Sequence, residues 1–297
     1  MGGTEKAAAT PVIEKFRTIL LVLASVAIVL YVGLCSYLFV EQRKMLYFPP
    51  PTKLADPPPS SGYRTLNVTV PEVGVIEDWW MPPASAEKPT VVFFHGNASD
   101  RTSFLALGAI LQRQGWGAVL ASYPGYSGNP GSPSEATLLA DARATLSAIA
   151  PRSGPIIVWG HSLGSGVAAR MASEGRAAGL ILESPYTSLP DVAAGLYPYI
   201  AVHWLMLDRF DTKALVDKIT VPVLIFHGAD DPQIPFAMGR ELADALGKRA
   251  TLVRLEGVGH YPHQIDLSDT VIQWSEDHCV AVAACRKAPG VSQTGGN

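Results

Sequence analysis

One short motif constrains the fold of this chain more than any other feature. The apolar run 156–159 (Ile-Ile-Val-Trp) leads directly into 160–164 (Gly-His-Ser-Leu-Gly), and a helical pattern follows. A Gly-x-Ser-x-Gly sequence between a buried strand and a helix predicts a sharp turn that lifts the serine, here Ser162, above the carboxyl edge of a sheet. Gly160 and Gly164 are expected because a Cβ at either position would strike neighbouring backbone.

The rest of the chain alternates short β-branched runs with helical stretches, which is typical of a mostly parallel sheet covered by helices. Gly166 is expected to keep the helix after Ser162 close to the sheet. Two runs predict an antiparallel hairpin, 66–70 and 75–80, and six predict parallel strands, 91–94, 118–121, 156–159, 180–182, 221–226 and 251–255. Helices are expected near 102–114, 134–149, 163–174, 235–246 and 265–279. We therefore expect an α/β domain at 62–280 with a mostly parallel eight-stranded sheet flanked by helices.

Two segments stand apart from this alternation. Residues 184–220 are too long for a simple connection and are rich in aromatic and apolar side chains, so they predict a small cap over a site. Residues 18–40 form an uncharged run of roughly 23 residues, close to the ~20 that a helix needs to cross a bilayer.

The N-terminal run could also be a cleaved signal peptide or a lipoprotein signal. It is longer than the usual apolar core of a signal peptide, no small-residue cleavage site follows it, and Leu34 precedes Cys35 where a lipoprotein signal needs a small residue. We expect a retained single-pass membrane anchor at 18–40, a tail at 1–17, a Pro-rich linker at 41–61 and a flexible tail at 281–297. Basic residues flank the run on both sides, so the side of the membrane that holds the domain is left open.

Composition excludes several classes of function. A formal net charge of −3 gives no basic surface for nucleic acid. The three cysteines imply neither a disulfide framework nor a zinc site, and no His, Cys and Asp cluster has ligand spacing. We therefore expect no metal and no organic cofactor.

A serine nucleophile needs a general base, and the base needs an orienting acid that precedes it in chain order in this architecture. His260 ends a glycine-containing loop just after a strand, and is favoured over His263, which stands where the next helix begins. The acid should follow the strand 221–226, where Asp230 and Asp231 are neighbours and only one can serve. Glu183 is an outside candidate, better explained as a structural carboxylate.

The oxyanion of the tetrahedral intermediate needs backbone N–H donors. One should be Leu163, which follows the nucleophile. The other should come from the loop after the first parallel strand, where the N–H of Asn97 is the expected donor and His95 is expected to fix the loop.

These motifs resemble the α/β-hydrolase superfamily, and more narrowly its membrane-anchored serine hydrolases of the bud-emergence type. The resemblance runs from Arg43 to about Ile272 and includes 42–49, 95–98, 123–128, 160–164 and 183–188. It implies a catalytic triad of Ser162, Asp231 and His260, because related enzymes place the acid three residues after the glycine that ends the strand. Pro124 and Ser99 depart from the usual pattern and leave the triad intact.

The resemblance also implies hydrolysis of an acyl ester or thioester, and the anchor and apolar cap suggest lipid-like substrates. Peptide hydrolysis is an alternative, although the chain before Pro89 is too short to form the extra domain that screens substrates in oligopeptidases. A membrane scaffold that uses the fold without catalysis is a third hypothesis.

Overall fold

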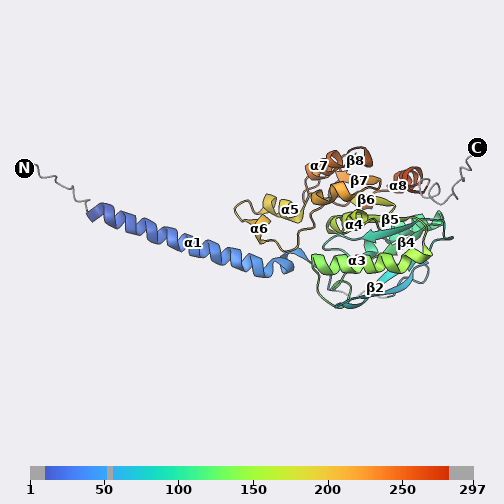
Figure 1. Ribbon diagram of the computed structural model, residues 1–297, viewed down its shortest axis with the longest axis horizontal. Coiled ribbons are helices and arrows are strands. Elements are labelled where there is room, and N and C mark those ends of the chain that lie inside the picture. Colours follow the sequence, from blue (N-terminus) through green and yellow to red (C-terminus); the bar gives the residue numbers. More distant parts are fainter. Residues whose placement is uncertain (1–10, 52–55, 281–297) are drawn as a thin grey trace, which may run out of the picture.

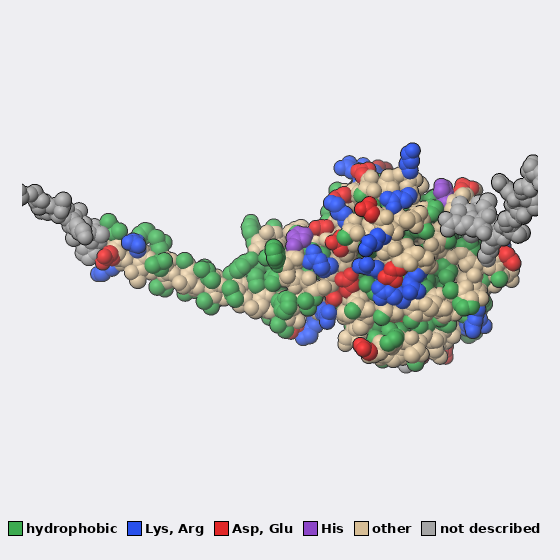
Figure 2. Space-filling model, in the orientation of Figure 1, with side chains coloured by type: hydrophobic (Ala, Val, Ile, Leu, Met, Phe, Trp, Pro, Cys, Tyr) green, Lys and Arg blue, Asp and Glu red, His purple; other side chains and the backbone are tan. Residues whose placement is uncertain are grey.

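The computed structural model describes residues 11–51 and 56–280. The expected tail 281–297, the first ten residues of the tail 1–17 and residues 52–55 of the linker lie outside these ranges. A long helix, α1 (Pro11–Leu46), projects from an α/β body (Figure 1). It contains the uncharged run 18–40 and is long and apolar enough to cross a membrane, with a mean hydropathy of 2.7 over its most apolar window. Figure 2 shows hydrophobic side chains along its length.

The body is built on one eight-stranded sheet with the order β1-β2-β4-β3-β5-β6-β7-β8. β1 pairs with β2, and β2 with β4, in antiparallel fashion, and all other pairs are parallel. The expected hairpin and mostly parallel sheet are therefore confirmed. The strands are β1 (Arg64–Val70), β2 (Gly74–Met81), β3 (Thr90–Phe94), β4 (Gly117–Leu120), β5 (Ile156–His161), β6 (Gly179–Glu183), β7 (Val223–Gly228) and β8 (Ala250–Leu255).

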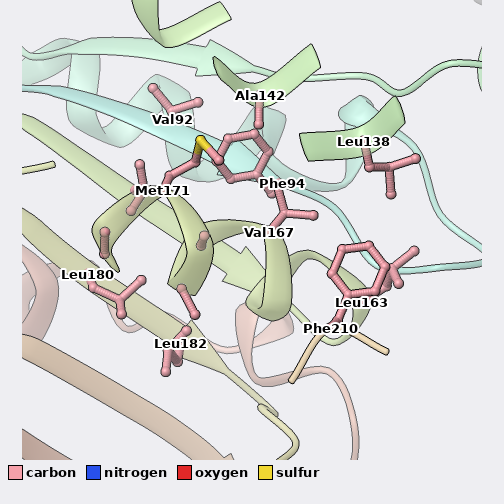
Figure 3. Close-up of a cluster of buried hydrophobic side chains, with 14 of the residues drawn as sticks. Val92, Phe94, Leu138, Ala142, Leu163, Val167, Met171, Leu180, Leu182 and Phe210 are labelled. Carbon is pink, nitrogen blue, oxygen red and sulfur yellow. The ribbon is translucent and has the colours of Figure 1, made fainter. Parts of the chain in front are cut away.

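Helices cover both faces of this sheet. One buried cluster packs the sheet against α3 (Glu135–Ile149), α4 (Leu163–Ser173) and α7 (Phe236–Leu246) (Figure 3). The second packs the other face against α2 (Leu105–Arg113) and α8 (Ser268–Ser275).

Strand β3 shows how a continuous apolar run serves both clusters. Val92 and Phe94 belong to the first cluster, and both are labelled in Figure 3. Val91 and Phe93 belong to the second. Successive residues of a strand point to opposite faces, so the parallel strands need apolar residues at every position.

Element boundaries differ from the sequence expectations where caps and prolines intervene. The helix expected at 102–114 begins as a 3₁₀ turn, Arg101–Phe104, because the Asp100 side chain accepts the N–H of Thr102. The last helix starts at Ser268 rather than 265, since Pro262–Gln264 forms a separate 3₁₀ turn, and it ends in a π-helical turn, Glu276–Val280.

Residues 184–220, the expected cap, lie between β6 and β7. They hold α5 (Leu189–Leu196), α6 (Val202–Leu205) and a 3₁₀ segment, Lys213–Lys218. In Figure 1, α5 and α6 lie beside the C-terminal half of α1, away from the sheet. We refer to residues 184–220 as the cap segment.

The glycines around Ser162 give a test of how tightly this fold is packed. A Cβ at Gly160 would collide with the backbone of Gly164 and Ser165, which cannot move as a side chain can. We expect Gly160→Ala to lower the free energy of unfolding by about 2–3 kcal/mol. Gly195, in α5, has no atom within 4 Å of its Cβ position. Gly195→Ala is the matched control and should be neutral or slightly stabilising in thermal unfolding. Equal stability of the two variants would contradict the packing argument.

Candidate active site

Ser162 occupies the turn between β5 and α4 in a backbone conformation that few L-residues adopt. Its φ is 51° and its ψ is −118°. A Cβ at Gly164 would collide with the carbonyl oxygen of Phe94 in β3, so glycine is required for the turn to approach the neighbouring strand. Gly166 has a different role from the one expected. A Cβ there would come 2.5 Å from Tyr186 Oη and 2.8 Å from Phe210 Cβ, so this glycine makes room for those side chains.

The structure brings Ser162, His260 and Asp231 together in one hydrogen-bonded chain. His260 Nε2 lies 2.9 Å from Ser162 Oγ, and His260 Nδ1 lies 2.8 Å from Asp231 Oδ2. The His260 side chain is buried, with 4% of its surface exposed. The three residues come from the ends of β5, β7 and β8, which meet at the same edge of the sheet.

Asp231 is held as a carboxylate by its surroundings. Burial alone would raise the pKa of Asp231, but hydrogen bonds from His227, His260 and the Ile234 amide outweigh it and hold that pKa well below its usual range. The Oδ1 atom also accepts the N–H of Gln233 at 2.9 Å. An ionised carboxylate can only accept, so it fixes the proton of His260 on Nδ1 and leaves Nε2 free to accept from Ser162.

The neighbouring candidates lie in other environments. The Asp230 amide donates to the carbonyl of Val258, and no hydrogen bond joins its carboxylate to an imidazole in the described part of the chain. His263 pairs instead with Glu183, whose Oε1 lies 2.6 Å from both the backbone N and Nδ1 of His263.

Glu183 is fully buried and its hydrogen bonds are satisfied. Its second carboxylate oxygen accepts the indole N–H of Trp159 at 3.0 Å. Burial opposes ionisation, but the nearby imidazoles of His161 and His263 and the hydrogen bonds from His263 outweigh it, so the pKa of Glu183 is lowered. Glu183 thus supports the loop that carries His260.

Two donors that sequence analysis did not assign fix the backbone of His260. His161 Nε2 lies 2.8 Å from the His260 carbonyl oxygen, and Ser184 Oγ donates to the same oxygen at 3.2 Å. Burial lowers the pKa of His161 to about 4, so this imidazole is neutral and donates its Nε2–H. The only sequence signals were their positions, directly before Ser162 and directly after β6.

His161, Glu183 and His263 also bring three ligand-type atoms within 4.8 Å of one another. The carboxylate already accepts from His263 and Trp159, and His161 donates to a carbonyl. These partners explain the group as a hydrogen-bonded support, and no step of the chemistry below needs a metal there.

The loop after β3 lies directly against Ser162. An ideal Cβ at Gly96 would be 3.5 Å from Ser162 Cβ, so the backbone of this loop reaches the hydroxyl-bearing turn. The Asn97 side chain accepts from Phe48 N at 2.9 Å and from Tyr126 Oη at 3.2 Å. Its backbone N–H donates to no acceptor among the described residues, and Leu163, as the first residue of α4, has no acceptor within its helix.

His95 is buried within this loop. Its Nδ1 lies 2.8 Å from the Gly96 carbonyl oxygen, and Tyr123 Oη donates to the His95 carbonyl at 2.9 Å. Burial lowers the pKa of His95 to about 4. These contacts place His95 in the structure of the loop rather than beside the Ser162 hydroxyl.

Comparison with known proteins gives two family models that match the chain. One is described as serine aminopeptidase, S33, and covers residues 85–208, and the other as TAP-like protein and covers residues 203–280. An uncharacterised protein of Mycobacterium tuberculosis is 34% identical over 238 residues, which is 77% of this chain and 83% of that protein. The lysophosphatidylserine lipase ABHD12 of Danio rerio is 33% identical over 198 residues. That match spans 59% of this chain and 52% of the lipase, so the chain covers about half of the lipase's length.

Solved structures share the same fold at low identity. An esterase of Pyrococcus furiosus superposes with a TM-score of 0.62 at 17% identity, over 77% of this chain and 99% of the esterase. Est1E of Butyrivibrio proteoclasticus, bound to ferulic acid, gives a TM-score of 0.61 at 20% identity, over 72% of this chain and 98% of that protein. The sheet order, the family models and the mycobacterial relative agree: the chain belongs to the α/β-hydrolase superfamily.

Proposed function

We propose that the protein is a membrane-anchored serine hydrolase that cleaves carboxylic ester or thioester bonds through an acyl-Ser162 intermediate. The observation that carries this proposal is the hydrogen-bonded chain from Ser162 Oγ through His260 to Asp231, at 2.9 and 2.8 Å. Nucleophile, base and orienting acid are in the order and geometry that acyl transfer requires.

In this mechanism Ser162 Oγ attacks the acyl carbon while His260 Nε2 takes its proton. The tetrahedral oxyanion is stabilised by the N–H groups of Leu163 and Asn97, each worth roughly 10²–10³ in rate. His260 then gives its proton to the leaving alcohol or thiol. Water, deprotonated by His260, attacks the acyl-enzyme and releases the acid, while Asp231 holds the imidazole in one tautomer throughout.

Membrane attachment is supported by α1. Its uncharged run, 18–40, has the length of a single span, and most of its side chains are exposed, apart from those near its end that face the cap segment. An exposed apolar helix of this length is unfavourable in water and stable in hydrocarbon. We assign residues 18–40 as the anchor, 41–61 as the linker, 62–280 as the hydrolase domain and 184–220 as its cap.

A lipid-like acyl substrate is supported by two observations. The curated relatives of ABHD12 type carry the name lysophosphatidylserine lipase. The cap segment also carries exposed apolar side chains next to the anchor. A peptide substrate is the second candidate, because one matching family is described as a serine aminopeptidase. A panel of acyl esters, acyl thioesters, lysophospholipid and aminoacyl anilides separates these substrates.

Ser162→Ala tests the nucleophile. The full-length protein should react covalently with a fluorophosphonate probe, and this labelling should be lost in Ser162→Ala because, among the described residues, no other hydroxyl donates a hydrogen bond to the His260 imidazole. In-gel fluorescence measures the result. A folded wild-type protein that never labels would favour a non-catalytic scaffold, and undiminished labelling of the variant would exclude Ser162.

The two neighbouring aspartates offer a matched pair. Asp231→Ala should lower kcat/KM by roughly 10³–10⁴, since His260 loses the carboxylate that orients it. Asp230→Ala changes the adjacent residue, which makes no such contact, and should leave kcat/KM within about threefold. Ester hydrolysis rates decide between them. A larger loss of kcat/KM in Asp230→Ala than in Asp231→Ala would identify Asp230 as the orienting acid.

Glu183→Gln separates a supporting carboxylate from a catalytic one. Because the pKa of Glu183 is lowered in the folded protein from its ordinary value of 4.5, its ionised form stabilises the fold above that value. The stability gap between wild type and Glu183→Gln should be largest near neutral pH and shrink as the pH falls below about 4.5. Thermal unfolding across pH measures the gap, and fluorophosphonate labelling should persist in the variant. Loss of labelling in a folded Glu183→Gln protein would argue against a purely supporting role.

A further inference from the structure

An apolar groove lies between α1 and the cap segment, outside the hydrogen-bonded chain at Ser162. On one wall it is lined by Phe39, Gln42 and Leu46 of α1, and on the other by residues of α5 and α6. The groove has a volume of about 200 Å³ and is open to solvent. Almost all of its lining is apolar, so its occupant is apolar as well.

The spacing of the lining residues shows that two helices face each other across the groove. On α5, Leu189, Val192, Ala193 and Leu196 follow the i, i+3, i+4, i+7 pattern of one helical face. A second cavity shares Phe39 and Leu205 with the groove and extends it along α1 to Tyr31. From Tyr31 to Leu46 the helix rises roughly 22 Å, so the combined track has the length of an extended alkyl chain.

Polar contacts fasten the cap segment to α1 along this track. Near the N-terminal end, Tyr31 Oη donates to the carbonyl of Tyr199 at 2.9 Å. Further along, Gln42 donates to the Leu205 carbonyl at 3.2 Å and accepts the Leu207 N–H at 2.8 Å. These contacts fix the two walls of the groove relative to each other, and the surfaces between the contacts are apolar.

The outer part of the groove lies at the depth of the expected membrane span. Tyr31 is nine residues before Val40, the end of the uncharged run, which is about 14 Å along the helix. The cap segment therefore contacts α1 well inside the run. Its exposed aromatic side chains, Tyr199 at 88% and Trp204 at 91%, have the chemistry of residues that sit at a bilayer interface. Figure 2 shows hydrophobic side chains continuing from α1 onto this region.

The inner end of the groove is linked to the loop beside Ser162 by a short stretch of chain and one hydrogen bond. Leu46 lines the groove, and two residues later the N–H of Phe48 bonds to the side chain of Asn97 in the loop against Ser162. On the other wall, Leu189 belongs to the same buried cluster as Leu163, the residue after the nucleophile. The α1 wall of the groove is thus joined, through Phe48 and Asn97, to the loop that lies against Ser162.

The geometry points to this groove as the acyl-chain site of the hydrolase, filled laterally from the adjoining leaflet by lipid esters with a single chain. This inference rests on the proposed function, because it names the substrate class for Ser162. The occupant is a lipid because the open mouth lies beside the anchor, where bilayer chains are the apolar neighbours. The lipid carries a single acyl chain because α1 and α5 enclose a single track between them.

Ala193 lines the groove, so Ala193→Trp should fill it. Ala194, the next residue of α5, does not line the groove, so Ala194→Trp is the matched control. Full-length protein in phosphatidylcholine vesicles is assayed on monooleoylglycerol in the bilayer and on soluble nitrophenyl butyrate. We expect Ala193→Trp to lower the ratio of long-chain to short-chain rates at least tenfold and Ala194→Trp to keep it within twofold. An unchanged ratio in Ala193→Trp, or equal loss in both variants, would overturn the inference.

Trp204 reports on the leaflet directly, because the other five tryptophans, Trp79, Trp80, Trp116, Trp159 and Trp274, are buried. Vesicles with brominated acyl chains should quench the wild-type fluorescence and leave that of Trp204→Phe nearly unchanged. Equal quenching of the wild type and of Trp204→Phe would contradict entry of the lipid from the leaflet.

A non-hydrolysable ether of glycerol with a diazirine in its alkyl chain tests the groove without catalysis. Photolabelling of peptides from 189–206 that is lost in Ala193→Trp and kept in Ala194→Trp supports the site. Its absence in the wild type overturns it. If this labelling is seen while the wild type hydrolyses no ester, the proposed function fails and the groove stands as a lipid-binding site.

Discussion

The close approach of the β5–α4 turn to strand β3 is the contact on which the site depends. Glycine at position 164 lets the turn approach the backbone of Phe94, and glycine at position 160 lets the turn fold back against Gly164 and Ser165. That approach holds Ser162 at a φ of 51°, a conformation that costs free energy for a residue with a Cβ. Two hydrogen bonds offset part of this cost, from Ser162 N to the Glu183 carbonyl and from Ser165 N to the Ser162 carbonyl, both 2.9 Å. The strain is thus supported by the strands on either side.

The two buried carboxylates near the site show how partners set the role of one chemical group. Asp231 and Glu183 both have lowered pKa values, and both accept a hydrogen bond from the Nδ1 of a histidine. His260 turns its other nitrogen to a serine hydroxyl, whereas the ring of His263 lies tilted beside Phe104 at a ring distance of 5.1 Å. The first pair can move a proton, and the second fixes a loop. The role of each carboxylate–histidine pair is therefore set by the group that the imidazole contacts on its other side.

Local patterns were sufficient to predict the sheet and the serine turn, because apolar runs, glycine spacing and the strand–helix order can be recognised from residues that are close together in the sequence. They could not separate Asp230 from Asp231 on physical grounds, since both follow β7 and only the turn geometry decides which one faces His260. The bonds from His161 and Ser184 to the His260 carbonyl were also missed. They join residues 99 and 76 positions apart, and no local pattern encodes such pairs. Gly166 was assigned the wrong neighbour for the same reason.

Helix α1 is part of the folded unit, and electrostatics explains why. Arg43, just after the apolar run, forms a two-pronged ion pair with Asp208 of the cap segment, at 2.9 and 3.2 Å. Asp208 is almost fully buried and also accepts the N–H of Glu135 at the start of α3. Glu135 in turn accepts the N–H groups of Arg209 and Phe210.

This network links α1, the cap segment and α3 through two carboxylates. A buried carboxylate without its cation is costly, and removing α1 would take the Arg43 guanidinium away from Asp208 while the N–H of Glu135 stays. The cap segment is therefore positioned by α1 as much as by the hydrolase body.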